Sequence, residues 1–118
     1  MGEQHQYDLE VRTLEFAKEV DEFVSKLPRS IVNLSHGGQL VRSAGSVGAN
    51  YIEANESLGK KDFLLHIKIS RKESKESRYW LQLLAHAGAP EQEAARLIAE
   101  STELMKIFGA ILRRSQTG

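Results

Sequence analysis

The residues of this 118-residue chain that could do chemistry are few and scattered. The chain has no cysteine, which excludes disulfides, thiolate zinc sites and cysteine nucleophiles. Glu73 and Glu76 have the spacing of inward-facing carboxylates in di-iron helix bundles, but those centres also need Glu-x-x-His pairs, which are absent. No glycine-rich phosphate-binding loop occurs, and no metal-ligand spacing relates the four histidines, His5, His36, His66 and His86. We therefore expect no enzyme, no metal site and no cofactor.

Charge is the second chemical feature of the sequence. The 16 basic and 16 acidic residues cancel, which argues against coating nucleic acid by bulk charge. Residues 1–30 carry four bases and seven acids, a net charge of −3, whereas residues 60–78 carry seven bases and three acids, a net charge of +4. Six of these bases share one side of a predicted helix and form a candidate nucleic-acid-binding stripe: Lys61, Lys68, Arg71, Lys72, Lys75 and Arg78.

Two interpretations of this stripe stay open. Tyr79 lies on the same side and could stack on a base, which favours nucleic-acid binding. The alternative is an ordinary solvated helix face with partners four residues apart, such as Lys72 and Glu76.

Apolar residues repeat at spacings of three and four, and no strand-like alternation persists. This pattern predicts an all-α protein, an antiparallel up-down-up-down four-helix bundle. Asp8 is a candidate N-cap of the first helix, and Ile31 and Leu34 are expected to fold back on the core from a connector at 28–35. The expected elements are a tail at 1–7, a bundle at 8–114 with helices at about 8–27, 38–57, 60–86 and 90–114, and a tail at 115–118.

The second and third helices are expected to approach each other closely. The second helix contains Gly45 and Gly48 in its interior, each of which costs roughly 0.8–1 kcal/mol relative to alanine. The seam of the third helix has three serines at its middle, Ser70, Ser74 and Ser77. Each of their hydroxyls can bond back to a carbonyl of its own helix. Arg42, Asn50 and Glu53 could form a polar cluster with Arg71 or Lys72 that sets register.

The third helix has more apolar surface than one seam can use, since a second stripe lies roughly 80–140° from the first. Exposed apolar patches usually mark contact surfaces, so this stripe predicts a closed homo-oligomer. The alternative is that the connector or helix edges cover it. The candidate interface residues are Arg42, Gly45, Ser46, Ala49, Glu53, Leu65, Ile69, Glu73, Glu76, Trp80 and Leu83.

The run from Gln39 to Ala54, QLVRSAGSVGANYIEA, resembles the second-helix signature QLxRSAxSIxANIAEG of the four helix bundle protein family. These proteins are also called 23S ribosomal RNA intervening-sequence proteins. Lys61-Asp62-Phe63-Leu64 and the run from Arg71 to Glu76 look like the family's third helix. The resemblance covers about residues 8 to 86. Many members have proline where this chain has Gly48, and glycine where it has Ala54.

The resemblance implies a left-handed antiparallel bundle that assembles into a barrel-like homopentamer. A distantly similar protein is the accessory protein of diversity-generating retroelements, which binds reverse transcriptase and nucleic acid. That relative is strongly basic whereas this chain is neutral, which weakens the analogy because fold does not carry function.

Two functions follow as hypotheses. The first is a non-enzymatic homo-oligomer, a pentamer by resemblance, whose basic stripe contacts RNA or a ribonucleoprotein. The second is a structural or adaptor protein that binds another protein and no nucleic acid. No apolar run approaches the ~18–20 residues of a membrane span, and the first residues lack an apolar signal-peptide core, so we expect a cytoplasmic protein without membrane contact.

Overall fold

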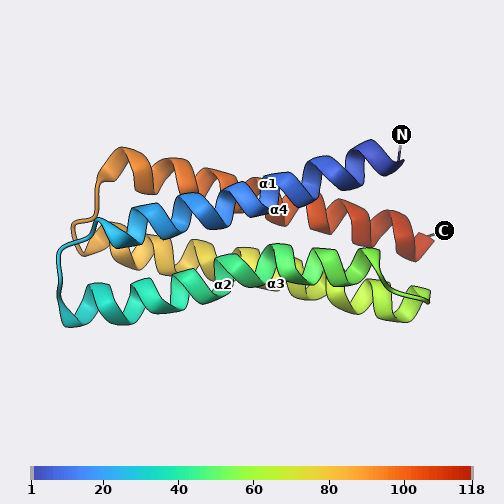
Figure 1. Cartoon of the computed structure of the whole chain (residues 1–118), viewed down its shortest axis with the longest axis horizontal. Helices are drawn as coiled ribbons and strands as arrows, with labels where there is room; N and C mark the ends of the chain where they lie inside the picture. The colour runs from blue at the N-terminus through green and yellow to red at the C-terminus, as the bar shows by residue number, and fades with distance from the viewer. Residues whose placement is uncertain (1, 118) are drawn as a thin grey trace.

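The computed structural model describes the backbone of residues 2–117 and the side chains of residues 9–116. Four helices follow one another, α1 (Gly2–Ser25), α2 (Ile31–Asn55), α3 (Lys60–His86) and α4 (Glu91–Thr117). Each runs antiparallel to the next in a body of 46 × 22 × 20 Å (Figure 1). The predicted all-α up-down-up-down bundle is therefore confirmed. None of the described helices is both long enough and apolar enough to cross a membrane.

The bounds of α3 agree with the prediction, but both chain ends are more helical than expected. Helix α1 begins at Gly2, so the predicted tail at 1–7 is wrong from residue 2 onward and Asp8 lies inside the helix rather than at its N-cap. Helix α4 continues to Thr117, so the tail predicted at 115–118 is helical over 115–117. No proline lies in either segment, and adding residues to an existing helix is far easier than starting one. Residues 1 and 118 lie outside the described residues.

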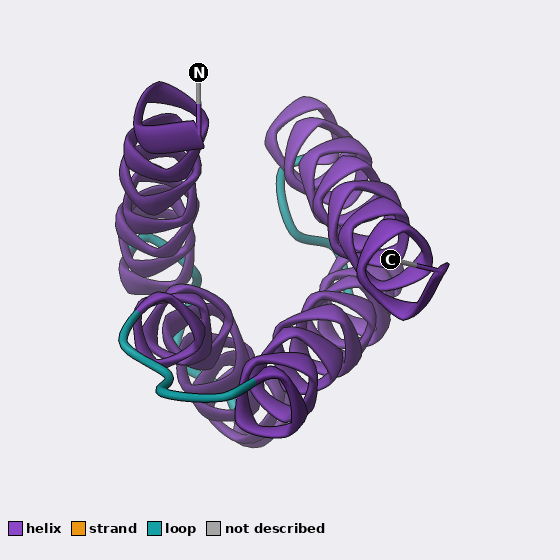
Figure 2. Ribbon diagram, turned by 90° about the vertical axis from the view of Figure 1, so that its right-hand side faces the viewer, coloured by secondary structure: helices purple, strands orange, loops and turns teal. Residues whose placement is uncertain are grey.

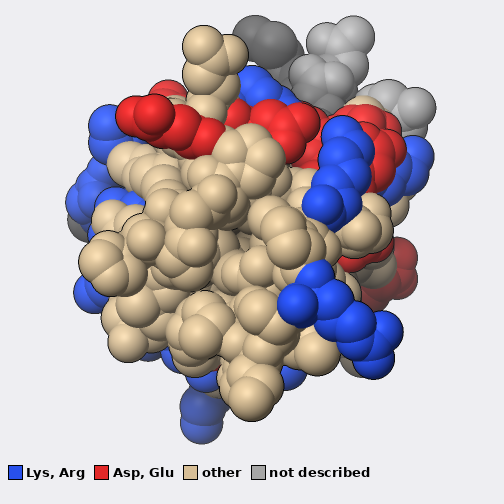
Figure 3. Space-filling model, turned by 90° about the vertical axis from the view of Figure 1, so that its left-hand side faces the viewer, with Lys and Arg blue, Asp and Glu red and all other residues tan. Residues whose placement is uncertain are grey.

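Helix α2 begins at Ile31 rather than at residue 38, because Ser30 caps it. The Ser30 hydroxyl accepts a hydrogen bond from the Asn33 backbone N–H at 3.0 Å. Ile31 then precedes the buried Leu40 by nine residues, which places it on roughly the opposite helix face. The expectation that Ile31 and Leu34 return to the core is therefore wrong, since they are 87% and 59% exposed. Both lie at the start of α2. Figure 3 shows that this end of the bundle carries a broad surface without charged side chains.

The core runs along the centre of the bundle, and its largest fully buried side chains include Phe16, Leu40, Ile67, Leu81, Leu104 and Phe108. Helices α2 and α3 pack most extensively, whereas α1 and α4 touch least and splay apart at one end (Figure 2). The seam between α1 and α4 is bridged by ion pairs, Arg12–Glu100 at 2.7 Å, Arg96–Glu19 and Lys26–Glu93 at 3.7 Å. The α2–α3 pair is thus the rigid centre from which the candidate surfaces project.

Serine side chains allow α2 and α3 to approach closely, as expected. The Ser43 and Ser77 hydroxyl oxygens lie 2.9 Å apart across the seam. The Ser74 and Ser77 hydroxyls donate to carbonyls of their own helix, as predicted. The prediction is wrong for Ser70, which donates across the seam to the Val47 carbonyl at 2.9 Å because α2 is near enough to supply it.

Candidate nucleic-acid interface

The acidic residues of α3 are drawn toward α2. The Arg42 guanidinium of α2 donates to Glu73 Oε2 at 3.0 Å and to Glu76 Oε1 at 2.5 Å. Trp80 Nε1 also donates to Glu76 Oε1, at 3.3 Å. A polar cluster therefore forms around Arg42, but the predicted partners Arg71 and Lys72 are wrong. The register of the two helices places the carboxylates, rather than the bases, opposite Arg42.

The Arg42 cluster, defined as Arg42, Glu73, Glu76 and Trp80, is held together by hydrogen bonds and ion pairs among its members. A hydrogen bond with Glu73, together with those from Arg42 and Trp80, lowers the pKa of the Glu76 carboxyl. Hydrogen bonds to Glu76 and then Glu73 raise the pKa of Arg42. Glu73 is buried, and its Oε1 has no hydrogen-bond partner among the described residues.

The third acid of α3 lies on the same flank. Asp62 Oδ1 is 3.6 Å from His66 Nε2, and His66 Nδ1 lies 3.1 Å from Asn50 Oδ1 of α2. Among the residues with described side chains, no three His, Asp or Glu side chains could hold a metal ion together. The polar groups on this flank therefore tie α3 to α2.

The bases of α3 are left without acidic partners as a result. Across residues 9–116, no carboxylate forms an ion pair with any of the six bases of the predicted stripe. The Lys72–Glu76 pair, which the solvated-face interpretation requires, does not form because Arg42 holds Glu76. Arg78 is half-buried and donates to Thr102 Oγ1 at 3.4 Å, while the other five bases are exposed.

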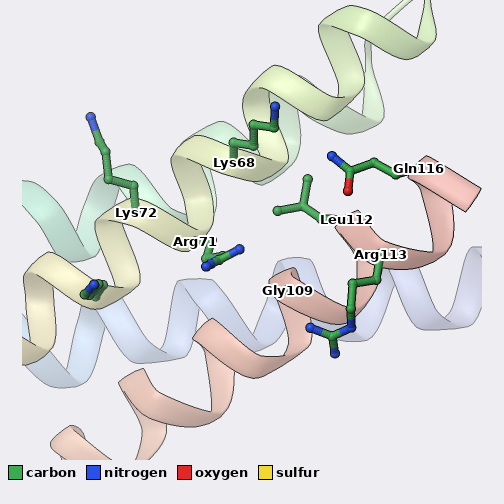
Figure 4. A pocket seen from close by; sticks show the side chains of 8 residues that line it. Lys68, Arg71, Lys72, Gly109, Leu112, Arg113 and Gln116 are labelled. Carbon is green, nitrogen blue, oxygen red and sulfur yellow. The ribbon is translucent and has the colours of Figure 1, made fainter.

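Four of these bases line a groove of about 410 Å³ between α3 and α4 (Figure 4). Figure 4 shows Arg71 extending from α3 toward α4, Lys68 one turn away on the same helix, and Arg113 and Gln116 on α4. Among the residues whose side chains the structure describes, no acid contributes to the lining, which consists of Lys68, Arg71, Lys72, Lys75, Gly109, Leu112, Arg113 and Gln116. We call this the basic groove.

The basic groove contains residues that sequence reasoning missed. Arg113 reads in the sequence as a cation at the end of a helix, where it suits the helix dipole, and nothing there connects it with Lys68 or Arg71. Only the register of α4 against α3 brings them together. Two bases of the predicted stripe, Lys61 and Arg78, lie outside the lining of the groove. Lys61 instead lines an adjacent hollow together with Gly59, Asp62, Leu64, Leu65 and Lys68.

Comparison with known proteins supports the helical bundle and the family that the sequence resembles. The family model described as "23S rRNA-intervening sequence protein" matches residues 6–110. The chain belongs to this family. A crystal structure of a protein of unknown function from the S23 ribosomal protein family of Bacteroides thetaiotaomicron is similar, with 27% identity and a TM-score of 0.80. The match covers 92% of this chain and 97% of that one. No curated protein matches the chain.

In this member of the 23S rRNA-intervening sequence protein family, the predicted oligomer surface lies mainly on the outer flank of α2 and α3. Arg42, Gly45, Ala49, Glu53 and Leu65 are exposed. The half-buried candidates are Ser46, Ile69, Glu76, Trp80 and Leu83. Glu73 differs from the rest because it is buried within the protomer.

The two interior glycines of α2 have different surroundings. A Cβ atom at Gly48 would lie 2.9 Å from Thr13 Oγ1, so this glycine lets α1 and α2 approach closely. A Cβ atom at Gly45 would have no neighbour within 4 Å. The close packing expected at both positions is thus found at Gly48, where the neighbour is α1 rather than the expected third helix, whereas Gly45 faces outward.

Proposed function

We propose that this protein is a non-enzymatic homo-oligomer, a pentamer by family resemblance, that binds RNA through the exposed basic side of α3. The outer flank of α2 and α3 would join the copies. The phosphate groups of RNA would lie along the bases between Lys68 and Lys75. The description of the family as 23S rRNA-intervening sequence proteins supports a connection with RNA.

The observation that carries this proposal is the separation of charge across α3. Glu73 and Glu76 pair with Arg42 of α2, and Asp62 lies near His66 of its own helix. Lys68, Arg71, Lys72 and Lys75 line a groove to which no carboxylate of the described side chains contributes. Neighbouring cations without counter-charges favour a phosphate ligand, because neutralising phosphates also releases the counterions condensed on the RNA. A chain of zero net charge thereby presents a locally cationic surface.

The two proposed surfaces occupy largely different sides of α3 and meet at Leu65, which lines a hollow together with Lys61 and Lys68. Arg42 contacts the flank that faces α2, and Arg78 contacts Thr102 on the flank that faces α4. Copies joined through the first flank would leave the basic groove of each copy open. A closed ring would repeat the groove once per subunit, which increases affinity for a long RNA by raising the effective local concentration.

RNA binding is tested by fluorescence anisotropy with a labelled RNA at several salt concentrations. At ~50 mM salt we expect binding that weakens linearly on a log–log plot as salt rises. The double variant Lys68→Glu/Lys72→Glu should reduce affinity for any RNA sequence by about tenfold or more, since it makes the charge next to the phosphates about four units more negative. Lys18→Glu on α1 is the matched control and should leave affinity within about twofold, because Lys18 is exposed and lies on a different helix.

The oligomer is tested separately by light scattering. We expect a mass of several copies of the 13.2 kDa chain, five if the ring is pentameric. A mass of one chain would contradict the assembly. An oligomer that binds no RNA at ~50 mM salt would contradict RNA binding and favour the adaptor function instead.

A further inference from the structure

We propose that the RNA bound in the basic groove is single-stranded, and that one of its unpaired bases stacks on Tyr79. This inference rests on the proposed RNA binding and names the class of RNA. It is carried by three observations, the shape of the groove, the position of Tyr79 and the contacts that fix the Tyr79 ring.

The basic groove lies between two packed helices and has a partly apolar floor. Packed helix axes lie 8–10 Å apart, so a groove between them fits one backbone strand along its length. Leu112 is 5% exposed, and Gly109 has no side chain to fill the groove. A Cβ atom at Gly109 would lie 3.5 Å from Arg113 Nη1, so the guanidinium of Arg113 lies over this glycine. Arg71 and Arg113 thus line the groove from two helices, each with a planar guanidinium.

Tyr79 continues the line of the groove along α3. It follows Lys75 by four residues and Lys72 by seven, so all three side chains lie on one helix face. From Lys68 to Tyr79 the helix rises by roughly 16 Å, which spans a few nucleotides. Tyr79 is 55% exposed. The tyrosine that the sequence suggests as a stacking residue therefore lies beside Lys72 and Lys75, the bases proposed to bind phosphate.

The Tyr79 ring is supported on one side by a neighbouring aromatic ring. It packs edge-to-face on Trp80, with ring centroids 5.1 Å apart and an interplanar angle of 74°. Trp80 is fixed in turn by its hydrogen bond to Glu76 and by the ring of His36, whose centroid is 5.5 Å away. An exposed aromatic face that is already ordered loses little entropy when a base stacks on it. In a duplex the faces of paired bases are covered by their neighbours, so only an unpaired base can use this surface.

The test compares a labelled single-stranded RNA 12-mer without self-complementarity with the same strand annealed to its complement. At the same salt concentration we expect the full-length protein to bind the single strand at least about tenfold more tightly. Tyr79→Ala should weaken binding of the single strand by about fivefold or more and leave binding of the duplex unchanged. Tyr79→Phe keeps the ring and should retain the affinity for the single strand, which separates stacking from a hydroxyl contact.

A second readout is the fluorescence of Trp80, the one tryptophan of the chain. It should change when the single strand binds, because its indole touches the Tyr79 ring, and it should not change with the duplex. Equal affinity for single strand and duplex, with no effect of Tyr79→Ala, would overturn the stacking inference and leave the proposed RNA binding intact. Binding of neither probe would overturn the proposed function itself.

Discussion

The two flanks of α3 differ in how their charged side chains are arranged. On the α2 flank, small residues bring the backbones together, and the acids are paired or hydrogen-bonded around Arg42, His66 and Asn50. On the α4 flank, a glycine and a leucine form a floor, and the bases around it have no acid in the groove. The charges of the first flank pair within the protomer, whereas the bases of α3 that line the groove on the second flank have no acidic partner among the described side chains.

The difference shows that net charge and charge spacing along a helix do not predict an ionic surface by themselves. Lys72 and Glu76 have the spacing of a stabilising pair, yet Glu76 turns to Arg42. A cation on a neighbouring helix can therefore remove an acid from a surface and make that surface cationic without adding a single base. Arg42 pairs with Glu73 and Glu76 on one flank, and because it holds Glu76 it keeps that acid from Lys72.

The largest expected effect comes from removing Arg42. Arg42→Met should lower the free energy of unfolding by about 2–3 kcal/mol, because the buried carboxylate of Glu73 loses its cation. Urea unfolding measures this change. Lys72→Gln is the matched control, and since Lys72 is exposed and pairs with no acid among the described side chains it should change stability by less than about 0.5 kcal/mol.

The same variant also tests whether Arg42, on one flank of α3, affects RNA binding on the other flank. Freed from Arg42, Glu76 can pair with Lys72 four residues earlier, so Arg42→Met should reduce RNA affinity as well, although Arg42 lies away from the basic groove. An equal loss of stability in Arg42→Met and Lys72→Gln would show that the Arg42 cluster does not hold the seam.

A smaller effect is expected at the two glycines of α2. Gly48→Ala should lower stability by about 1–2 kcal/mol, because its Cβ atom would press on Thr13, which is buried and hydrogen-bonded to the Leu9 carbonyl. Gly45→Ala has open space and should raise protomer stability by up to about 1 kcal/mol through helix propensity.

Thermal unfolding at one protein concentration compares the two variants, and light scattering reports whether Gly45→Ala alters assembly. If both glycines respond alike, the contrast between an inward-facing and an outward-facing glycine is wrong.

The smallest effect concerns pH. The folded state lowers the pKa of Glu76 below its ordinary 4.5, through hydrogen bonds with Glu73, Arg42 and Trp80. A lowered carboxyl pKa stabilises the folded state fully above pH 4.5, and this contribution is lost as pH falls through the folded-state pKa. Glu76→Gln should therefore cost roughly 1 kcal/mol at pH 7 and progressively less below pH 4.5.

The free energy of unfolding is measured for the original protein and for Glu76→Gln at several pH values. The difference at each pH isolates Glu76, because both proteins contain all the other acids. A constant gap between the curves from pH 7 to pH 3 would mean that the charge of Glu76 contributes nothing.

The elements could be predicted to very different accuracy. Gly59 and the Gly88-Ala89-Pro90 run bracket α3, and Gly88 indeed adopts a φ of 107°, so its bounds follow from local conformational preferences. The start of α2 could not be placed as well, because the cap at Ser30 competes with the glycines at 37 and 38 as a starting signal. The stripe from Lys61 to Arg78 was predictable from helical periodicity, but its acid-free groove was not.

By itself the sequence determined which residues share a helix face, because a 3.6-residue turn fixes the angle between side chains before any tertiary contact forms. It thus determined four amphipathic helices, their serine-rich seam and the shared side of Lys68, Lys72 and Tyr79. Only the tertiary structure decided that Arg42 meets Glu73 and Glu76, that Arg113 joins Arg71, and that Gly48 rather than Gly45 faces α1. These contacts depend on how far one helix slides along another, and that register is set by packing over the whole length of the bundle.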